Sequence, residues 1–128
     1  MDGWDVIHRV TRAELLANGD LVEVSQELAR QAGWTVPMAI CRRAWAETVA
    51  WTPADGQHSG QSETGRLWDV LFVAMVHARA RKETDRFVFP LYVVERRTER
   101  TVKHVLMCAC GPDDVGNPCV TIGFPEEL

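Results

Sequence analysis

Four side chains near the C-terminus have the residue types of a metal site. His104, Cys108, Cys110 and Cys119 offer one imidazole and three thiols, which are ligands that zinc prefers. On a strand, His104 and Cys108 are separated by about 13 Å, at ~3.3 Å per residue. Zinc needs ligands that converge to about 2.0–2.3 Å, so a regular strand keeps His104 away from the cysteines. The spacing therefore predicts no metal site, and we expect these residues to be small core residues of a sheet.

The other ionisable groups form no recognisable catalytic set. His58 and Ser59 are adjacent in a polar stretch, and no Gly-x-Ser-x-Gly elbow occurs. Asp69 and His77 lie about 12 Å apart on a helix, too far to touch. They are either titrating groups in a pocket or residues of the first and last helical turns, where the helix dipole favours their charges. The second interpretation is favoured, and no catalytic residue or cofactor is predicted.

The densest positive charge lies between residues 79 and 103, with eight basic against four acidic residues. Such a segment either binds phosphate or an acidic protein, or combines a helix C-terminus with a solvated hairpin tip. The second interpretation is favoured, yet no other part of the sequence offers better binding candidates. The eight residues are Arg79, Arg81, Lys82, Arg86, Arg96, Arg97, Arg100 and Lys103.

Length and composition predict one globular domain over residues 1–128. Hydrophobic residues make up 46% of the chain and charged residues 25%, which excludes a disordered protein. The formal net charge of −4 argues against a generic nucleic-acid binder and is too small for a DNA mimic. The acidic start and the irregularly spaced cysteines favour a reducing cytoplasm with free thiols. A Cys110–Cys119 disulfide is geometrically conceivable, but that compartment disfavours it.

The run Gly65–Ala78 is almost continuously apolar and predicts a central helix that is buried on most sides. It is too short for a membrane span, which needs about 20 residues. Most of the five tryptophans are expected in the core, and one or two on the surface would act as binding anchors.

Capping and periodicity signals place the remaining elements. The N-terminal two-thirds is expected to be mainly helical, with two short strands at Trp4–Val10 and Leu21–Val24, and with helices at Arg12–Ala17, Gln26–Ala32 and from Pro37 to about Trp51. Residues 52–64 are expected to be a flexible loop. The C-terminal part is expected to form an antiparallel meander of Phe87–Glu95, Thr101–Cys110 and Cys119–Phe124. The sequence thus predicts an α+β fold in which the central helix packs on this meander.

Four segments together resemble a family of uncharacterised bacterial proteins found on plasmids, phages and other mobile elements. They are Val10–Glu14, Asn18–Ser25, Val36–Ala39 with Trp45, and Gly65–Leu71. The string Gly-Arg-Leu-Trp-Asp-Val-Leu is the most specific of them. Relatives tend to read Asp-Gly-Val-Leu-Val-Asp-Val where this chain has Asn-Gly-Asp-Leu-Val-Glu-Val, and the C-terminal cysteines are not part of the pattern. The resemblance implies a mobile-element setting but supplies no activity.

These observations favour a non-enzymatic accessory protein that binds a host or defence-system protein, as anti-CRISPR or anti-restriction proteins do. His8 and Arg9 ahead of Thr11 resemble the start of small ADP-ribosyltransferase-like domains, which implies an NAD-dependent enzyme as the alternative. A nucleic-acid-binding module that uses the basic segment 79–103 is the third hypothesis.

Overall fold

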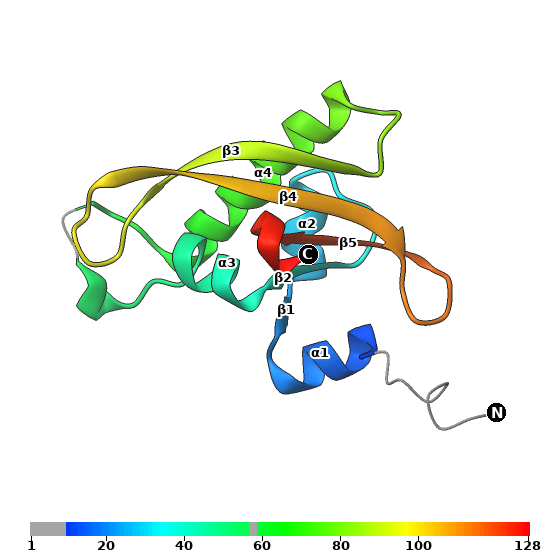
Figure 1. The fold of residues 1–128 in the computed structure, drawn as a ribbon. Helices are drawn as coiled ribbons and strands as arrows, with labels where there is room; N and C mark the ends of the chain where they lie inside the picture. The colour runs from blue at the N-terminus through cyan, green and yellow to red at the C-terminus, as the bar shows by residue number, and fades with distance from the viewer. Residues whose placement is uncertain (1–9, 57–58) are drawn as a thin grey trace.

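The computed structural model describes residues 10–56 and 59–128. Within these ranges, five strands form one mixed sheet in the order β1-β2-β5-β4-β3 (Figure 1). The strands are β1 (Leu21–Glu23), β2 (Met38–Cys41), β3 (Arg86–Val94), β4 (Thr101–Pro112) and β5 (Pro118–Gly123). The helices are α1 (Arg12–Asn18), α2 (Gln26–Gln31), α3 (Arg42–Thr48) and α4 (Glu63–Ala80), with the short 3-10 turns η2 (Pro53–Asp55) and η3 (Pro125–Glu127).

The expected C-terminal meander is confirmed. Strand β4 pairs antiparallel with β3 on one side and with β5 on the other. Cys108 lies opposite both Phe87 and Ile122, so these three side chains share one face of the sheet. Because one face of each strand is buried, the alternation of apolar and polar residues specifies this register. The α+β class is confirmed with it.

The expected helix from Pro37 to Trp51 is wrong at its beginning. Met38–Cys41 forms β2, which runs parallel to β5 with Ile40 opposite Ile122, and α3 begins only at Arg42. All four residues of β2 are buried because the strand lies inside the sheet and both of its faces are covered. A strand buried on both faces shows no alternation, so its apolar run cannot be told from a helix by periodicity.

Local capping signals correctly located the starts of α1 and α2, while α4 begins at Glu63, two residues before the run predicted for it. Thr11, Ser25 and Ser62 each accept a hydrogen bond from the backbone N–H three residues later. This satisfies one of the donors that a helix start leaves without a partner inside the helix. At the end of α1, Gly19 takes a left-handed conformation with φ of 85°, as expected for a helix stop.

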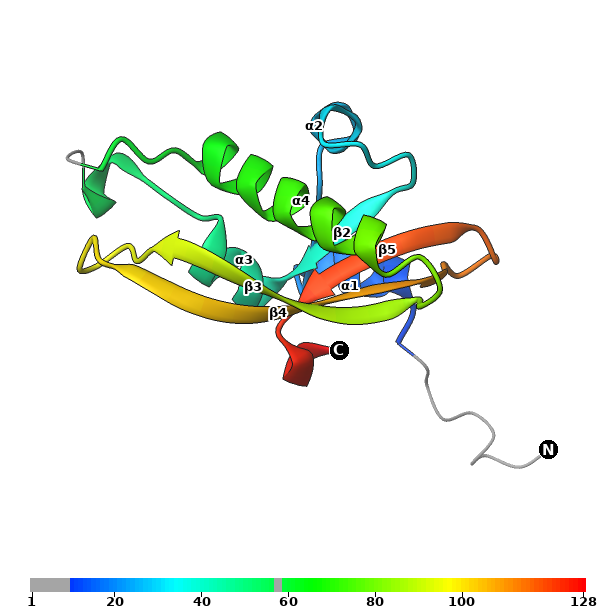
Figure 2. The same cartoon turned by 90° about the horizontal axis from the view of Figure 1, so that it is seen from above.

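Helix α4 is buried on one side only, so the expectation that it is buried on most sides is wrong. Leu67, Val70, Leu71 and Ala74 belong to the same buried cluster as residues of the sheet. The sheet lies against just one side of the helix (Figure 2), which leaves the opposite side to solvent. Asp69 is exposed and lies in the second turn, because the helix starts at Glu63; the expected first-turn position is wrong.

Arg66 is buried and ties α4 to two other elements. Its guanidinium donates to the carbonyl oxygens of Val49 at 3.0 Å, Val94 at 2.6 Å and Glu47 at 3.3 Å. It also lies over the ring of Trp51, 4.9 Å from the ring centroid. Burial, followed by the nearby charge of Arg96, holds the pKa of Arg66 below its ordinary value. The arginine of the Gly-Arg-Leu-Trp-Asp-Val-Leu string therefore stabilises the fold.

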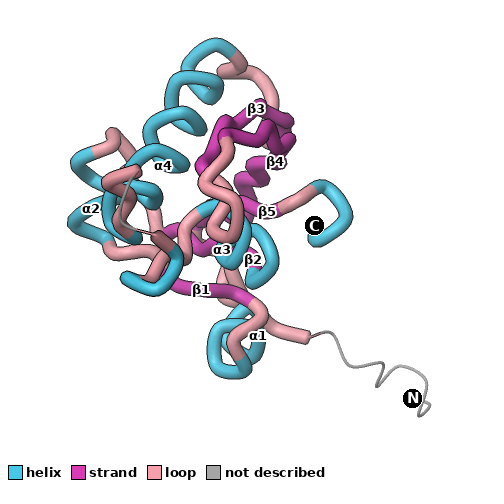
Figure 3. The backbone as a smooth tube through the Cα atoms, turned by 90° about the vertical axis from the view of Figure 1, so that its left-hand side faces the viewer, coloured by secondary structure: helices cyan, strands magenta, loops and turns pink. Residues whose placement is uncertain are grey.

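The sheet has one fully covered face and one partly covered face. α4 and α2 lie on one side, and η3 lies on the other (Figure 3). On that second side, Leu15 and Leu16 of α1 pack against Leu21, Ala39 and Cys41. We call this second side of the sheet the open face, because much of β3 and β4 is exposed there.

Three further expectations concern the N-terminal strand, the loop 52–64 and membrane spans. The strand expected at Trp4–Val10 lies outside the described residues, except for Val10, which has no regular structure. Of the loop 52–64, Pro53–Asp55 forms η2, while residues 57 and 58 are outside the described ranges. None of the helices in the described part of the chain has the length and apolar character needed to cross a bilayer.

Candidate functional site

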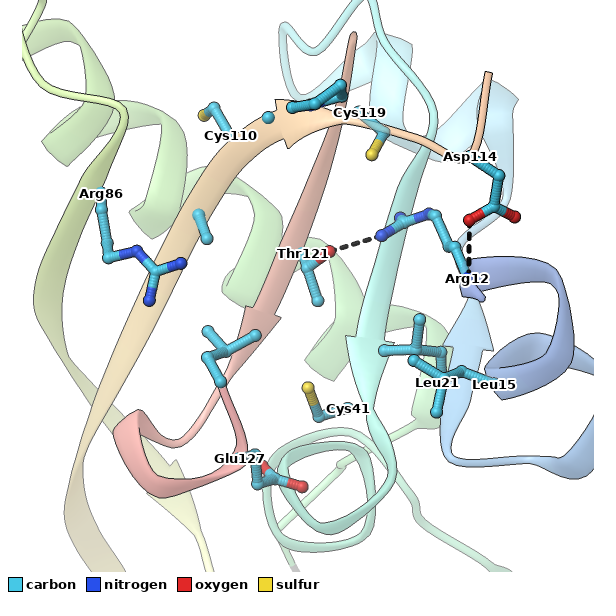
Figure 4. A pocket seen from close by; sticks show the side chains of 14 residues that line it. Arg12, Leu15, Leu21, Cys41, Arg86, Cys110, Asp114, Cys119, Thr121 and Glu127 are labelled. Carbon is cyan, nitrogen blue, oxygen red and sulfur yellow. Dashed lines mark hydrogen bonds between the residues drawn. The ribbon is translucent and has the colours of Figure 1, made fainter. Parts of the chain in front are cut away.

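A pocket of about 480 Å³ lies on the open face (Figure 4). Thr121, Cys41 and Ala109 line it from three neighbouring strands, which share a face by the register of the sheet. α1 forms one wall, and η3 with Arg86 of β3 lies on the other sides.

Arg12 holds a positive charge at this pocket. Its Nη1 donates to Thr121 Oγ1 at 2.5 Å, and its Nη2 donates to the carbonyl oxygen of Val120 at 3.1 Å. Both acceptors are neutral, so they orient the guanidinium without neutralising it. Arg12 is the first residue of α1, where the helix dipole disfavours a cation. The side chain is therefore held by tertiary contacts.

Asp114 fixes α1 to the loop between β4 and β5. Its two carboxylate oxygens accept from the backbone N–H groups of Arg12 at 2.8 Å and Ala13 at 3.0 Å. A carboxylate at a helix N-terminus satisfies unpaired donors and favours the dipole. The charge of Asp114 is thus directed to the helix end.

Glu127 plays the same part for α3. Its Oε2 accepts from the backbone N–H of Arg43 at 2.9 Å, and its Oε1 accepts from those of Ala44 at 3.1 Å and Phe124 at 2.9 Å. Cys41 occupies the N-cap position of α3 and makes no side-chain cap bond of its own. The carboxylate from η3 therefore replaces the missing cap.

Arg86 faces Arg12 across the pocket, and the two guanidinium groups point toward each other in Figure 4. The Arg86 guanidinium donates from Nη1 to the thioether sulfur of Met107 at 3.9 Å, which is a weak acceptor. Within residues 10–56 and 59–128, neither arginine forms an ion pair with a carboxylate. The pocket thus combines two guanidinium groups with two carboxylates that already serve helix ends.

The Cys41 thiol at the pocket is not activated. Burial, followed by the charge of Glu127, raises the pKa of Cys41 to about 11. A neutral thiol is a poor nucleophile, so Cys41 does not supply a thiolate at neutral pH. All four cysteines are free. Cys119 lies opposite Gly111, one residue from Cys110, so Cys110 and Cys119 point to opposite faces of the sheet.

His104 lies apart from the thiols, as the spacing argument predicts. It packs against the ring of Phe124, with ring centroids 5.4 Å apart, while Cys108 is in the core. Among the described residues, no group of three or more His, Cys, Asp and Glu side chains is placed to hold a metal ion.

Exposed apolar residues adjoin the pocket on the same face. Val88 lies opposite Met107, Pro90 opposite Val105 and Tyr92 opposite Lys103, each pair alternating with the core-facing pairs. Val88, Tyr92 and Val105 are exposed. We call these residues of β3 and β4 the apolar strip: Val88, Pro90, Tyr92, Val105 and Met107. The open face therefore joins a pocket with two cationic side chains to an apolar surface.

The basic residues of segment 79–103 do not form one patch. Arg79, Arg81 and Lys82 lie at the C-terminal end of α4, whereas Arg96, Arg97 and Arg100 lie in the hairpin after β3. Strand β3 separates the two groups by about 26 Å at ~3.3 Å per residue. Arg96 pairs with Asp55, with Nε 3.1 Å from Oδ2, and Lys103 lies beside the apolar strip.

Only Arg86 of the eight predicted residues lines the pocket, and Arg12 was missed. The one signal for Arg12 in the sequence is a basic residue directly after an N-cap, where a cation is unfavourable. Whether the other seven bind anything stays a prediction.

The four tryptophans in the described residues range from buried to exposed. Trp34 and Trp51 are buried, Trp45 is half-buried and Trp68 is exposed, while Trp4 lies outside the described residues. Trp34 donates from Nε1 to the carbonyl oxygen of Leu71 at 3.0 Å, which fixes it against α4.

A family model described as a family of unknown function matches residues 1–128. The chain belongs to this family, DUF6573. The expected membership of an uncharacterised family is thereby confirmed. Among curated proteins and among solved structures, none matches the chain. His8 and Arg9, which carry the likeness to ADP-ribosyltransferases, lie outside the described residues.

Proposed function

We propose that this DUF6573 protein is a non-catalytic binding protein whose open face holds an acidic segment of a partner protein. One observation carries the proposal: Arg12 and Arg86 point into one pocket from opposite sides, and neither has a carboxylate ion pair within the described residues. A guanidinium matches a carboxylate in shape and charge and forms charge-assisted hydrogen bonds with it. An acidic side chain of the partner supplies the missing counter-charge.

The apolar strip supplies the second half of the interface. Tyr and Arg are enriched among residues that dominate binding energy, and exposed apolar surface next to polar groups is typical of interaction sites. An extended segment that places an acidic residue between Arg12 and Arg86 reaches Val88 with a neighbouring apolar side chain, and reaches Tyr92 only with a residue about 20 Å further along, at ~3.3 Å per residue. The partner segment is therefore acidic at one position and apolar beside it.

The partner we propose is a host or defence-system protein, met in the cytoplasm by an accessory protein of a mobile element. Support comes from the small size, the free thiols and the sequence resemblance to plasmid and phage proteins. An anti-CRISPR or other anti-defence inhibitor fits this description, because such a protein needs a binding surface and no catalytic group. Nucleic acid is less favoured, because the basic segment is divided between two ends of β3.

The binding proposal is tested by titrating the ¹⁵N-labelled protein with the capped peptide Ac-Leu-Glu-Glu-Val-NH₂. We expect chemical-shift changes at the backbone amides of Ala109 and Thr121, and none with the Gln-for-Glu peptide. Arg86→Gln weakens binding about tenfold, the effect of losing one charge-assisted hydrogen bond. Arg97→Gln is the matched control, because Arg97 is equally basic and lies in the distant hairpin. Equal losses in both variants, or binding of a single-stranded oligonucleotide in place of the peptide, would contradict the proposal.

The anti-defence setting needs a separate test in cells. Expression beside a CRISPR or restriction system is expected to raise phage or plasmid survival, and Arg86→Glu to abolish the gain. No gain with any system tested would overturn this setting and leave the peptide result standing.

A further inference from the structure

Helix α4 presents three large apolar side chains to solvent. Trp68 is 36%, Phe72 49% and Val76 51% exposed. They are spaced four residues apart, so they lie above one another on successive turns. The rings of Trp68 and Phe72 contact edge to face, with centroids 5.0 Å apart. We call these three residues the outer stripe. Such an aligned apolar surface with a tryptophan is typical of a protein interface.

The exposed charges of α4 that flank the outer stripe have opposite signs toward its two ends. Asp69 lies in the N-terminal half and Arg79 in the last turn. Neither forms an ion pair within residues 10–56 and 59–128. A parallel neighbour with the same pattern would place like charges and like dipole ends together. An antiparallel neighbour with the same pattern places acid beside base and opposes the helix dipoles.

We propose that the outer stripe is the interface of a homodimer in which α4 of a second copy packs antiparallel on α4. A second copy of the chain carries the complementary charge pattern, because its α4 has the same sequence and runs in the opposite direction. Such an interface is isologous, because each copy uses the same patch of surface.

The spacing of the stripe suits this two-fold arrangement. With Phe72 at the axis, Trp68 lies about 6 Å to one side and Val76 about 6 Å to the other, at 1.5 Å per residue. Trp68 of each copy therefore meets Val76 of the second copy. Arg79 of the second copy lies within one further turn, in reach of the Trp68 ring and the Asp69 carboxylate.

The dimer leaves the open face free in both copies. α4 lies on the opposite side of the sheet from η3 (Figures 2 and 3), and η3 supplies Glu127 to the pocket. Two pockets on one particle raise the effective affinity for a partner that has two binding segments. The proposal does not depend on the function proposed for the pocket, since the two surfaces share no residue.

Sedimentation equilibrium of the full chain tests the proposal. We expect a monomer–dimer equilibrium that is populated at up to about 100 µM protein. Val76→Glu is expected to raise the dissociation constant at least about tenfold, because it buries an unpaired carboxylate against Trp68 in each half of the interface. Val115→Glu is the matched control, since Val115 is 79% exposed in the loop between β4 and β5. Far-UV circular dichroism checks that both variants fold.

A charge exchange tests the orientation. Asp69→Arg and Arg79→Asp are each expected to weaken the dimer, and the double variant to restore it, because an antiparallel pair brings these positions together. A wild-type monomer at every concentration would overturn the proposal. So would equal effects of Val76→Glu and Val115→Glu, and a double variant no better than the single ones would overturn the antiparallel geometry.

Discussion

The open face and the outer stripe of α4 both expose apolar side chains, but they differ in shape and charge. The open face contains a pocket with two guanidinium groups on opposite sides, and its exposed apolar residues lie beside that pocket. The outer stripe is a single row on a helix, with opposite charges at its two ends. A pocket with cations held in place suits an acidic segment from another protein. A convex row with a self-complementary charge pattern suits a second copy of the same chain.

The difference arises from what each surface rests on. The open face is built on strands, where side chains alternate, so one residue in two is available for binding while its neighbours form the core. In α4, residues three or four positions apart lie on the same side, so one helix carries both the outer stripe and a row of core residues. Substitutions at neighbouring positions of α4 should therefore change either the stability of the monomer or the association of two copies.

The largest effect is expected at Arg66, which ties α4 to α3 and β3. Arg66→Ala leaves one buried and two partly buried carbonyl acceptors without their donor and removes the contact with Trp51. Because each such loss costs about 1–3 kcal/mol, unfolding free energy should fall by about 4 kcal/mol. Urea denaturation measures it. Asp69→Asn on the exposed side is the control, and a loss below about 1 kcal/mol for Arg66→Ala would contradict its proposed role.

A neighbouring pair in α4 compares the two sides of the helix directly. Leu71→Ala is expected to cost about 3 kcal/mol, because Leu71 is fully buried and truncation leaves a cavity. Phe72→Ala should change the stability of the monomer by less than about 0.5 kcal/mol and weaken the dimer. Denaturation below and above the dissociation constant separates these effects. Similar costs for both variants at low concentration would show that the outer side of α4 is packed.

A smaller loss of stability is expected at high pH, where the Cys41 thiol in the pocket ionises. The folded-state pKa of Cys41 is raised from 9.0 to about 11, so the folded state favours the neutral thiol. Its contribution to stability is complete below pH 9.0 and is lost as pH rises to about 11, since the unfolded chain ionises first. Unfolding free energy should fall by about 2–3 kcal/mol over this window.

In Cys41→Ala, the fall in unfolding free energy at high pH is expected to be smaller by the part that Cys41 contributes. Cys108 also has a raised pKa, caused first by burial, so Cys108→Ala should reduce the remaining pH dependence. An unchanged pH profile in Cys41→Ala would show that this thiol is more accessible on the open face than its burial indicates.

The elements that follow from nearby residues were predictable. Thr11, Ser25 and Ser62 cap helices through bonds to residues three positions away, and the meander follows from alternation along three strands. Strand β2 was missed because it is buried on both faces and too short for periodicity to identify it. The exposure of the outer stripe was missed because an apolar run does not reveal how many sides of a helix will be covered.

Most of the candidate site could not be predicted from the sequence, because its contacts join residues that are far apart in the chain. Arg12 contacts Thr121, and Asp114 contacts the start of α1, across more than a hundred residues of chain. Arg86 was among the predicted binding residues because of its charge, but its position opposite Arg12 depends on the order of strands in the sheet. The basic segment looked continuous because β3, which separates its two groups, is short in sequence and long in space.

The sequence by itself determined the α+β class, most helix boundaries, the free thiols and the membership of an uncharacterised family. The first three depend on capping, periodicity and composition, which act over a few residues at a time, whereas the family membership rests on the resemblance of four segments and on the family match. Only the tertiary structure decided which side of α4 faces solvent, where β2 enters the sheet and which two arginines share a pocket. Those outcomes depend on packing between segments far apart in the chain, where burial of apolar surface and pairing of backbone groups select one arrangement.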